Sequence, residues 1–453
     1  MLRGWQSRRT DESTKARFWH SGFMSNLAVH PGSETTPAHS QLGAWIWSVL
    51  AAFGVYFCMY AFRKPFTSAA FETSTLWGLG EKPVLVMAQV LGYTLSKFIG
   101  IRIIAEMQPQ RRAVGILFLI GLAEGALLLF AIVPSPYHVI CLFLNGLPLG
   151  MVFGLVLGFL EGRRHTEALT AGLCASFILA DGVTKSIGSW LLDQQVSQRW
   201  MPFLAGAIFV LPLFLFVWML TQIKAPSETD IALRTERVPM TQSERRRLLW
   251  KYGPGLLALV TVYLMVTILR TLRADFAREL WDGLGRAAAP SNFTTSEIYV
   301  ALGVLVVNGL SVLIRDNHRA FFTSLGVSMF GIILLAFSLL GMRWNWLDDF
   351  SFMVLLGLGL YLPYVAMHTT VFERMIAMTR ERGNLGFLLY VVDAIGYLGY
   401  VAVLFGKELL PKSSDFLTFF TITGWTVTIC SIIALFLTRI YFSHKCSEVI
   451  VNP

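Results

Sequence analysis

Two apolar stretches with an arginine near their end decide the fold: residues 53–66, FGVYFCMYAFRKPF, and residues 260–276, VTVYLMVTILRTLRADF. Arg63 lies late in the first apolar stretch of the chain, and Arg270 lies late in the seventh. An arginine costs about 2.5–3.5 kcal/mol at the centre of a spanning helix, so it usually faces a pathway or a partner. Matching cations in two half-chains indicate one anion site at their junction. The alternative is that both residues cap the outer ends of their helices.

The composition is that of a membrane protein. Hydrophobic residues make up 55% of the 453 residues, and charged residues make up only 14%. The apolar stretches reach the length of about 20 residues that a helix needs to cross roughly 30 Å of hydrocarbon. They are too long and too continuously apolar for barrel strands, so the predicted fold is all-α. We expect twelve transmembrane helices, at residues 42–66, 83–105, 113–133, 138–160, 167–192, 201–222, 252–275, 296–314, 320–341, 350–372, 384–406 and 415–440.

A long polar segment divides these spans six and six. It is rich in charge, Pro, Ser and Thr, which is typical of a cytoplasmic linker between two helix bundles. Matching motifs in the two halves form a weak internal repeat, and such repeats place a substrate site near the midplane. The predicted organisation is a cytoplasmic N-terminal segment, a first bundle, a linker, a second bundle and a cytoplasmic tail, at residues 1–41, 42–222, 223–250, 251–442 and 443–453.

The positive charge has a distribution that indicates topology rather than nucleic-acid binding. The net charge is +9, and basic residues gather in loops that would share one side of the membrane. This is the positive-inside pattern, and it places both termini in the cytoplasm. We expect a multi-pass protein of the bacterial inner membrane, with the lipid bilayer as its surroundings and no nucleic-acid partner. The basic clusters are Arg8–Arg9, Arg111–Arg112, Arg163–Arg164, Arg245–Arg247 and Arg380–Arg382.

Short motifs in both halves resemble a known family, the organophosphate:phosphate antiporters of the major facilitator superfamily. The bacterial glycerol-3-phosphate and hexose-phosphate transporters are its familiar members. The match is a chain of short motifs in the expected order rather than continuous similarity. The motifs are Tyr60–Phe66 (YAFRKPF), Gly92–Ile99 (GYTLSKFI), Arg270–Phe276 (RTLRADF), Tyr361–Glu373 and Gly396–Gly399 (GYLG).

The resemblance implies specific roles for the cations of spans one, two and seven. Arg63 and Arg270 would grip a phosphate group from opposite halves, with Lys97 nearby. The planar donor fork of a guanidinium matches phosphate oxygens, which agrees with this assignment. Lys64 and Asp275 match positions that form a salt bridge between the halves on the outer side. Such a bridge would hold one gate closed.

Further polar and aromatic residues complete the predicted substrate site. The family has a histidine in span five where this chain has a serine, which can still form hydrogen bonds. The tyrosines could line a cavity or anchor the helices at the membrane interface. A histidine in an apolar run, like that of span ten, is more often packed or hydrogen-bonded than a ligand, and a role in substrate binding is the alternative. These residues are Tyr60, Tyr93, Ser176, Tyr361 and His368.

Other charged residues are candidates for gating or coupling. Asp181 and Lys185 are four residues apart on one helix face, so they could neutralise each other. Asp393 has no partner within its own span, so it could pair with Arg63 or Lys97, or carry a proton. Arg273 joins this group because it lies beside Arg270 and Asp275. A cytoplasmic salt-bridge network is expected among Arg102, Glu161, Arg163, Glu373 and Arg374.

The predicted function is secondary active transport of an organic anion. The resemblance implies that this anion is phosphorylated and that inorganic phosphate could move in exchange for it. The alternatives are a proton-coupled symporter of an organic anion and a transporter-like receptor that senses an anion. No nucleotide-binding motif, metal-ligand spacing or paired catalytic motif is present, so we expect no enzyme activity, no metal and no cofactor. The expected partner is a small anionic substrate, and we expect the chain to function as a monomer.

Overall fold

The computed structural model consists almost entirely of helices in the part of the chain that it describes. Residues 1–44 and 45–453 form two separate units. Of the first unit the structure describes only residues 38–44, the first turns of a helix, and the remaining description concerns the second unit. The described residues are 38–71, 75–160, 166–223, 242–285, 289–379, 385–409 and 415–451.

The first half of the chain folds into helices that follow the predicted apolar stretches. A short hairpin precedes the second helix, and the sixth predicted span is broken at Phe209, where its two pieces bend by 43°. The elements are α1 (Ala38–Ala61), η1 (Pro65–Ser68), β1 (Thr75–Leu76), β2 (Leu79–Gly80), α2 (Glu81–Glu106), α3 (Pro109–Ile132), α4 (His138–Leu160), α5 (Thr166–Asp193), α6 (Met201–Ile208) and α7 (Val210–Thr221).

The second half repeats this plan. Its fourth span differs from a plain helix, because a π-helical turn, η2, interrupts it around His368. Single π-helical turns of this kind occur frequently at functional sites. The elements are α9 (Gln242–Asp275), α10 (Ala277–Gly283), α11 (Pro290–Val312), α12 (Asn317–Arg343), α13 (Asp349–Ala366), η2 (Met367–Val371), α14 (Phe372–Thr379), α15 (Leu385–Leu409) and α16 (Phe416–Val451).

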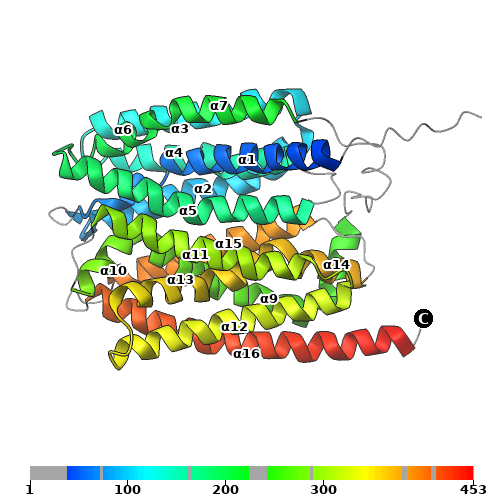
Figure 1. Ribbon diagram of the computed structural model, residues 1–453. Helices are drawn as coiled ribbons and strands as arrows, with labels where there is room; N and C mark the ends of the chain where they lie inside the picture. The colour runs from blue at the N-terminus through cyan, green and yellow to red at the C-terminus, as the bar shows by residue number, and fades with distance from the viewer. Residues whose placement is uncertain are drawn as a thin grey trace, which may run out of the picture. The chain divides into compact units, whose positions relative to one another are not determined.

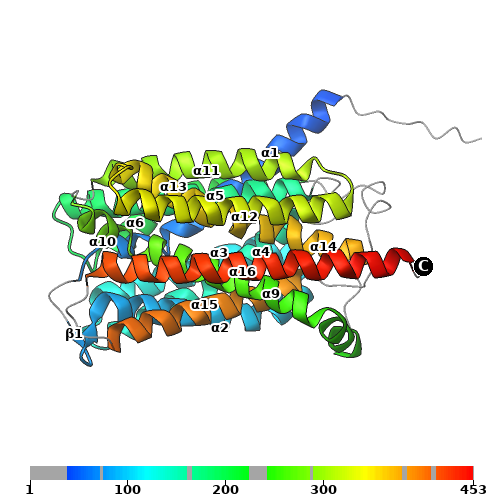
Figure 2. The ribbon, with the colours of Figure 1, turned by 90° about the horizontal axis from the view of Figure 1, so that it is seen from below.

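Most of these helices can cross a membrane by length and composition. Among the described residues ten helices qualify, and the bent pair of α6 and α7 gives an eleventh. The remaining long helix is α5, and Asp181 and Lys185 lower the hydropathy of its middle. Figure 1 shows the helices side by side, with α6 and α10 at one end and α14 at the other. We call these ends the α10 end and the α14 end, and Figure 2 shows the same arrangement from below.

The two halves contact each other through a reciprocal pairing. The second helix of each half packs against the fifth helix of the other, so that α2 contacts α15 and α5 contacts α11. Within each half the second helix also packs against the fourth, α2 against α4 and α11 against α13. The same pairings in both halves are the structural counterpart of the internal repeat. The two main helix contacts between the halves are therefore related to each other.

Glycines bring α2 and α4 close together. A Cβ atom added at Gly92 would lie 2.1 Å from the carbonyl oxygen of Phe143, and one at Gly146 would lie 2.0 Å from that of Gln89. Small residues allow this approach between membrane helices, where dispersion contacts replace the hydrophobic effect as the driving force. An alanine at either position would push the helices apart.

The start of α13 is capped by Asp348, which lies in the loop before the span. Its carboxylate accepts hydrogen bonds from the backbone N–H groups of Phe350 and Ser351. Hydrogen bonding by the side chain of Ser351, with these N–H groups, lowers the pKa of Asp348 below its usual range. A charged acceptor at this position stabilises a helix start.

Candidate functional site

Arg63 lies in a turn after α1, so the prediction that the first helix continues to residue 66 is wrong. Pro65 has no N–H, so it cannot continue the helical hydrogen bonds, and α1 ends at Ala61. Other side chains take up the freed carbonyl groups. Gln89 donates to the carbonyl of Arg63 at 3.0 Å, and Asn145 donates to that of Phe62 at 2.9 Å. This network fixes the turn that presents the Arg63 side chain.

The guanidinium of Arg63 is buried against aromatic rings. Only 2% of the residue is exposed. Its Cζ lies 3.9 Å from the ring centre of Tyr93 on α2 and 5.9 Å from that of Tyr397 on α15. Stacking on aromatic faces is favourable for a guanidinium, but it leaves the N–H donors in the plane available. The Nε of Arg63 is buried and has no hydrogen-bond partner in the described residues.

Arg270 occupies the related place in the second half, inside the continuous helix α9. It is 6% exposed, and its Cζ lies 4.1 Å from the ring centre of Tyr364 and 5.7 Å from that of Tyr361, both on α13. One guanidinium nitrogen makes a long hydrogen bond of 3.4 Å to the hydroxyl of Tyr397. The Nε of Arg270 is also buried without a partner among the described residues.

Tyr397 therefore links the two arginines. Its ring faces Arg63 and its hydroxyl meets Arg270, and it also packs edge-on against Tyr93 with ring centres 5.3 Å apart. In the part of the chain that the structure describes, no carboxylate forms an ion pair with either arginine. Two buried cations without a counter-charge are costly in a low-dielectric interior, so an anion from outside would be strongly favoured there.

A buried ion-pair network lies next to Arg63, towards the α10 end. Lys64 forms a salt bridge with Asp275 and lies 3.8 Å from Asp181. The hydroxyl of Tyr400 donates to the other oxygen of Asp275 at 2.9 Å. Lys185 pairs with Asp181 at 2.5 Å, as their spacing indicated, and also donates to the carbonyl of Ala274 in the other half. The structure thus brings together the residues that the resemblance paired across the halves.

A second layer of contacts between the halves lies at the α10 end. Lys82, at the start of α2, pairs with Glu279 of α10 at 2.5 Å. Arg278 donates to the carbonyl of Ser68 at 2.9 Å, and the N–H of Gly80 donates to Glu408 of α15 at 2.9 Å. Sequence reasoning missed this layer, because its residues lie in loops and helix ends whose pairing depends on how the two halves meet.

A third cluster lies one helical turn beyond the arginines, towards the α14 end. Lys97 forms a buried salt bridge of 2.5 Å with Asp393, which links α2 to α15. The hydroxyl of Tyr263 donates to the same carboxylate, and the ring of His368 lies 3.9 Å from it. Lys97 also lies 4.9 Å from the ring centre of Tyr93, so this cluster adjoins the arginine site.

One face of α15 contacts all these layers in turn. Asp393, Tyr397 and Tyr400 are spaced by four and three residues, so they share a helix face. They contact Lys97, the two arginines and Asp275, respectively. Glu408 follows two turns later at the α10 end.

The other predicted site residues divide into those near the arginines and those engaged elsewhere. Tyr60 is buried, and its ring centre lies 6.5 Å from that of Phe177, which in turn lies 6.1 Å from Tyr361. The hydroxyl of Ser176 donates within its own helix, to the carbonyl of Leu173 at 2.6 Å. Arg273 pairs with Glu297 at 2.7 Å, which is a contact inside the second half.

The predicted cytoplasmic network is described only in part. Arg374 donates to the side chain of Asn317 at 2.7 Å. The side chain of Arg102 and residues Glu161 and Arg163 lie outside the described residues. Glu373 is partly buried beside Arg374 at the start of α14. Among the residues that the structure describes, there is no group of three or more potential metal ligands.

Sequence reasoning also missed two tyrosines that hold charged groups of the site. Tyr364 stacks on Arg270, and Tyr263 donates to Asp393. Tyr364 follows Tyr361 by three residues, so a helical-face argument could have found it. Tyr263 lies two turns before Arg270 on α9, which is a weaker signal of the same kind.

Comparison with known proteins gives the family and confirms the fold. Residues 65–445 match the family of unknown function DUF5690, and the chain belongs to this family. No curated protein matches the chain. A crystal structure of a D-xylose-proton symporter is similar, with a TM-score of 0.57 and 12% sequence identity over 88% of this chain and 97% of that chain.

The structural match confirms the predicted fold class. Over the described ranges the chain is almost entirely helical, with ten or eleven candidate membrane spans, and it has the major facilitator fold. The count of twelve spans in two bundles of six stays a prediction. It is an integral multi-pass membrane protein. The narrower resemblance to organophosphate:phosphate antiporters stays a prediction.

Proposed function

We propose that this chain is a secondary active transporter that moves an organic phosphate across the membrane by alternating access. The observation that carries the proposal is the pair Arg63 and Arg270. They come from opposite halves, are buried and meet at Tyr397, and no described carboxylate pairs with them. A ligand that binds both arginines would contact both halves at once, as alternating access around a central site requires.

The charge balance of the buried network supports a substrate with two negative charges. Around the arginines, the cations Arg63, Lys64, Lys185 and Arg270 face only the carboxylates Asp181 and Asp275. The other buried pairs at the junction are each neutral by themselves. This leaves an excess of two positive charges among the described residues. A phosphate ester carries about −1.5 to −2 charges near pH 7, which matches that excess better than a monocarboxylate does.

A neutral cargo fits this site less well. The similar solved structure is named as a D-xylose-proton symporter. A sugar without a charged group would leave both guanidinium groups uncompensated inside the protein, at a cost of several kcal/mol per ion. The aromatic residues around the arginines suit the apolar faces of a sugar ring, so a sugar phosphate would satisfy both parts of the site.

A counterflow assay with the purified chain in proteoliposomes tests the proposal. Vesicles loaded with inorganic phosphate or with a phosphate ester are diluted into a labelled phosphate ester, without a proton gradient. We expect uptake that depends on the internal anion, and none in vesicles loaded with the parent sugar. Equal uptake from empty vesicles would contradict exchange. Specific binding without any counterflow would instead support the receptor interpretation.

A second candidate is proton-coupled symport, and the surroundings of Asp393 favour it. This buried carboxylate is held by Lys97 of the other half, by the Tyr263 hydroxyl and by the nearby His368 ring. Such a group can exchange Lys97 for a proton when the halves separate. The same vesicles with an imposed proton gradient separate the two candidates. In a symporter the gradient drives uptake into empty vesicles, and Asp393→Asn abolishes this while counterflow persists.

A further inference from the structure

A carboxyl group inside the first half, that of Glu124, takes no part in the site described above. Glu124 lies in the apolar span of α3, about 12 Å along the helix before its end at Ile132. Both of its carboxyl oxygens are buried, and neither has a hydrogen-bond partner among the described residues. An ionisable group buried without a partner in a membrane helix is costly, which indicates a function.

The carboxyl group of Glu124 lies against the backbone of α6. A Cβ atom added at Gly206 would lie 2.3 Å from Oε2 of Glu124 and 3.0 Å from the ring of Phe62. Gly206 belongs to the last turn of α6, just before the break at Phe209 that bends the span by 43°. The carboxyl group therefore lies where α3, the broken span and the turn after α1 meet.

The cations on the elements around α3 have other partners. The helices α4, α6 and α7 pack against α3, and α6 and α7 contain no titratable residue. His138 of α4 pairs with Glu81 at 2.6 Å and packs on Phe130, which lies about 9 Å beyond Glu124 along α3. Arg199 donates to a backbone carbonyl at the end of α3 at 3.2 Å.

The turn after α1 supplies no counter-charge either. Arg63 stacks on Tyr93, and Lys64 pairs with Asp275. The other titratable side chains on α4 and on the apolar span of α1 are thiols and phenols, which cannot become cations: Cys58, Tyr56, Tyr60 and Cys141. An ionised Glu124 would thus have neither a counter-charge nor a hydrogen bond in the described part of the chain, so the neutral acid is the stable form.

A chain of hydrogen bonds joins α3 to the turn that holds Arg63. Asn145 of α4 donates to the carbonyl of Ala123 at 3.0 Å and to that of Phe62 at 2.9 Å. It also accepts a hydrogen bond of 2.7 Å from Gln89, which donates to the carbonyl of Arg63. A negative charge next to Ala123 would draw water into this packing, and the turn would lose its support.

We propose that Glu124 is a proton-binding site of the first half, which holds a proton in the conformation described and releases it when α3 and α6 separate. The proton keeps the packing around Phe62 intact, and this packing keeps Arg63 in place to bind the substrate. The site is separate from Asp393, whose carboxylate is paired with Lys97. The effect on the substrate rests on the proposed function, whereas the protonation of Glu124 does not.

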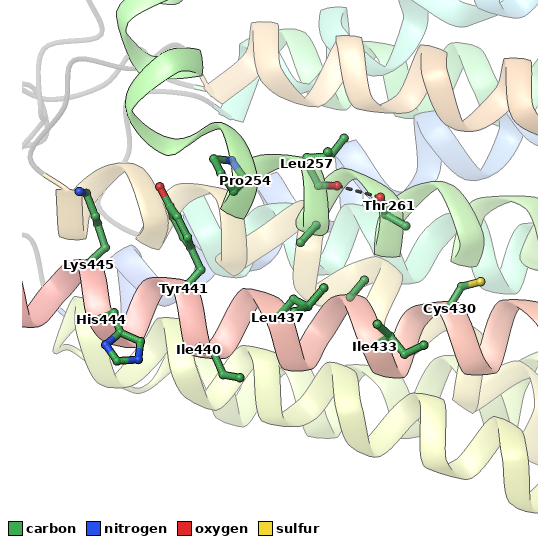
Figure 3. Close-up of a pocket in the computed structure, with 12 residues that line it drawn as sticks. Pro254, Leu257, Thr261, Cys430, Ile433, Leu437, Ile440, Tyr441, His444 and Lys445 are labelled. Atoms are coloured by element: carbon green, nitrogen blue, oxygen red, sulfur yellow. Dashed lines mark hydrogen bonds between the residues drawn. The ribbon is translucent and has the colours of Figure 1, made fainter.

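The proton site is also separate from an apolar groove of about 740 Å³ between α9 and α16 (Figure 3). The residues that line this groove, such as Leu257, Leu437 and Tyr441, belong to those two helices of the second half. The groove therefore gives a proton no access to Glu124. Because α6 lies at the α10 end (Figure 1), separation of α3 from α6 would open Glu124 towards that end.

Infrared spectroscopy of the purified full chain tests whether Glu124 carries a proton, because a carboxylic acid has a C=O stretching band that a carboxylate lacks. We expect this band in the wild type at neutral pH, a loss of the band as the pH is raised, and its absence in Glu124→Gln. Glu297→Gln is the matched control, since Glu297 is buried in a membrane span but paired with Arg273. It should keep the band, as should Asp193→Asn at an exposed acid. A wild type without the band, or an undiminished band in Glu124→Gln, would overturn the proposal.

Binding of a phosphate ester tests the link to Arg63. The affinities of the wild type and of Glu124→Gln are compared over the same pH range, so that ionisation of the ester cancels in their ratio. Glutamine resembles the neutral acid, so both proteins should bind equally at low pH. Where the infrared band has fallen to half, half of the wild-type molecules are competent, and the variant should bind about twofold more tightly.

A ratio that stays constant while the band disappears would overturn the link between Glu124 and Arg63. A lack of ester binding by both proteins would contradict the proposed function. The infrared bands would still decide whether Glu124 carries a proton.

Discussion

Arg63 and Arg270 occupy matching places in the two halves, but their backbone settings differ. Arg270 lies within the continuous helix α9, whereas Arg63 lies in a turn that Pro65 forces at the end of α1. Each guanidinium rests on tyrosines of its own half, Arg63 on Tyr93 and Arg270 on Tyr364. The shared partner, Tyr397, belongs to the second half alone.

The two halves therefore share the position of the buried guanidinium group, but they differ in the backbone structure that holds it. Because each arginine stacks within its own half, a relative movement of the halves would carry each cation with its tyrosines. The contact of Arg63 with Tyr397 would change in such a movement, and the contact of Arg270 with Tyr397 would not. Each half thus contributes one arginine to the site, but only Arg270 contacts the hydroxyl of Tyr397.

The largest expected effect comes from removing either arginine. Arg63→Ala and Arg270→Ala should each lower transport of a phosphate ester about 1000-fold, because each deletes two charge-assisted hydrogen bonds to the anion. Counterflow in proteoliposomes measures this, and size-exclusion profiles check that both variants fold. If one variant keeps wild-type transport, the two arginines do not both bind the anion, and the claim that they have matching roles in the two halves is wrong.

The network beside Arg63 should respond mainly in stability. Lys64→Gln or Asp275→Asn leaves a buried charge of the Lys64–Asp275 pair without its closest partner, which costs about 3 kcal/mol of unfolding free energy. The double variant Lys64→Gln with Asp275→Asn leaves neither charge, so we expect it to recover most of the loss. Thermal unfolding in detergent measures all three variants. Additive losses in the double variant would show that the two residues act independently.

Conservative replacement sharpens the comparison of the two arginines. Arg63→Lys and Arg270→Lys keep the charge but lose the planar fork, so each should weaken transport about tenfold. The apparent affinity for a phosphate ester is the quantity to measure. Full activity of both lysine variants would argue that charge alone matters and that the fork geometry does not.

The smallest expected effect distinguishes the tyrosines. Tyr397→Phe removes the hydroxyl that meets Arg270 and should weaken binding about fivefold, the value of one hydrogen bond. Tyr93→Phe keeps the ring on which Arg63 stacks and is the matched control, with less than about a twofold change expected. Equal effects of the two variants would contradict the asymmetry that we infer for Tyr397.

The sequence predicted the fold well because the apolar stretches of a membrane protein are set by the thickness of the bilayer. It also singled out some of the charges at the junction, since cations such as Arg63 in an apolar stretch are rare enough to stand out, but it missed Lys82 and Glu279. For Asp393 the sequence left three options open, namely a pair with Lys97, a pair with Arg63, or a role as a proton carrier, and the structure contains the pair with Lys97. Three-dimensional contact between the helices decides between them.

Other features depend on geometry that no short pattern contains. The end of α1 before Arg63 follows from Pro65 together with Gln89 and Asn145, which lie on other helices. The pair of Lys82 and Glu279 depends on how the loops of the two halves meet. The placement of Ser176, whose hydroxyl bonds within its own helix, depends on a rotamer that the sequence does not specify.

Equilibrium binding of a sugar phosphate and its parent sugar to the purified chain tests the central claim most directly. Calorimetry on the wild type, Arg63→Ala, Arg270→Ala and the double variant should show binding of the phosphate ester to the wild type only, and no binding of the sugar to any of them. Tight binding of the sugar phosphate to both single variants, or equal binding of the sugar and its phosphate to the wild type, would contradict the claim that Arg63 and Arg270 together bind an anion.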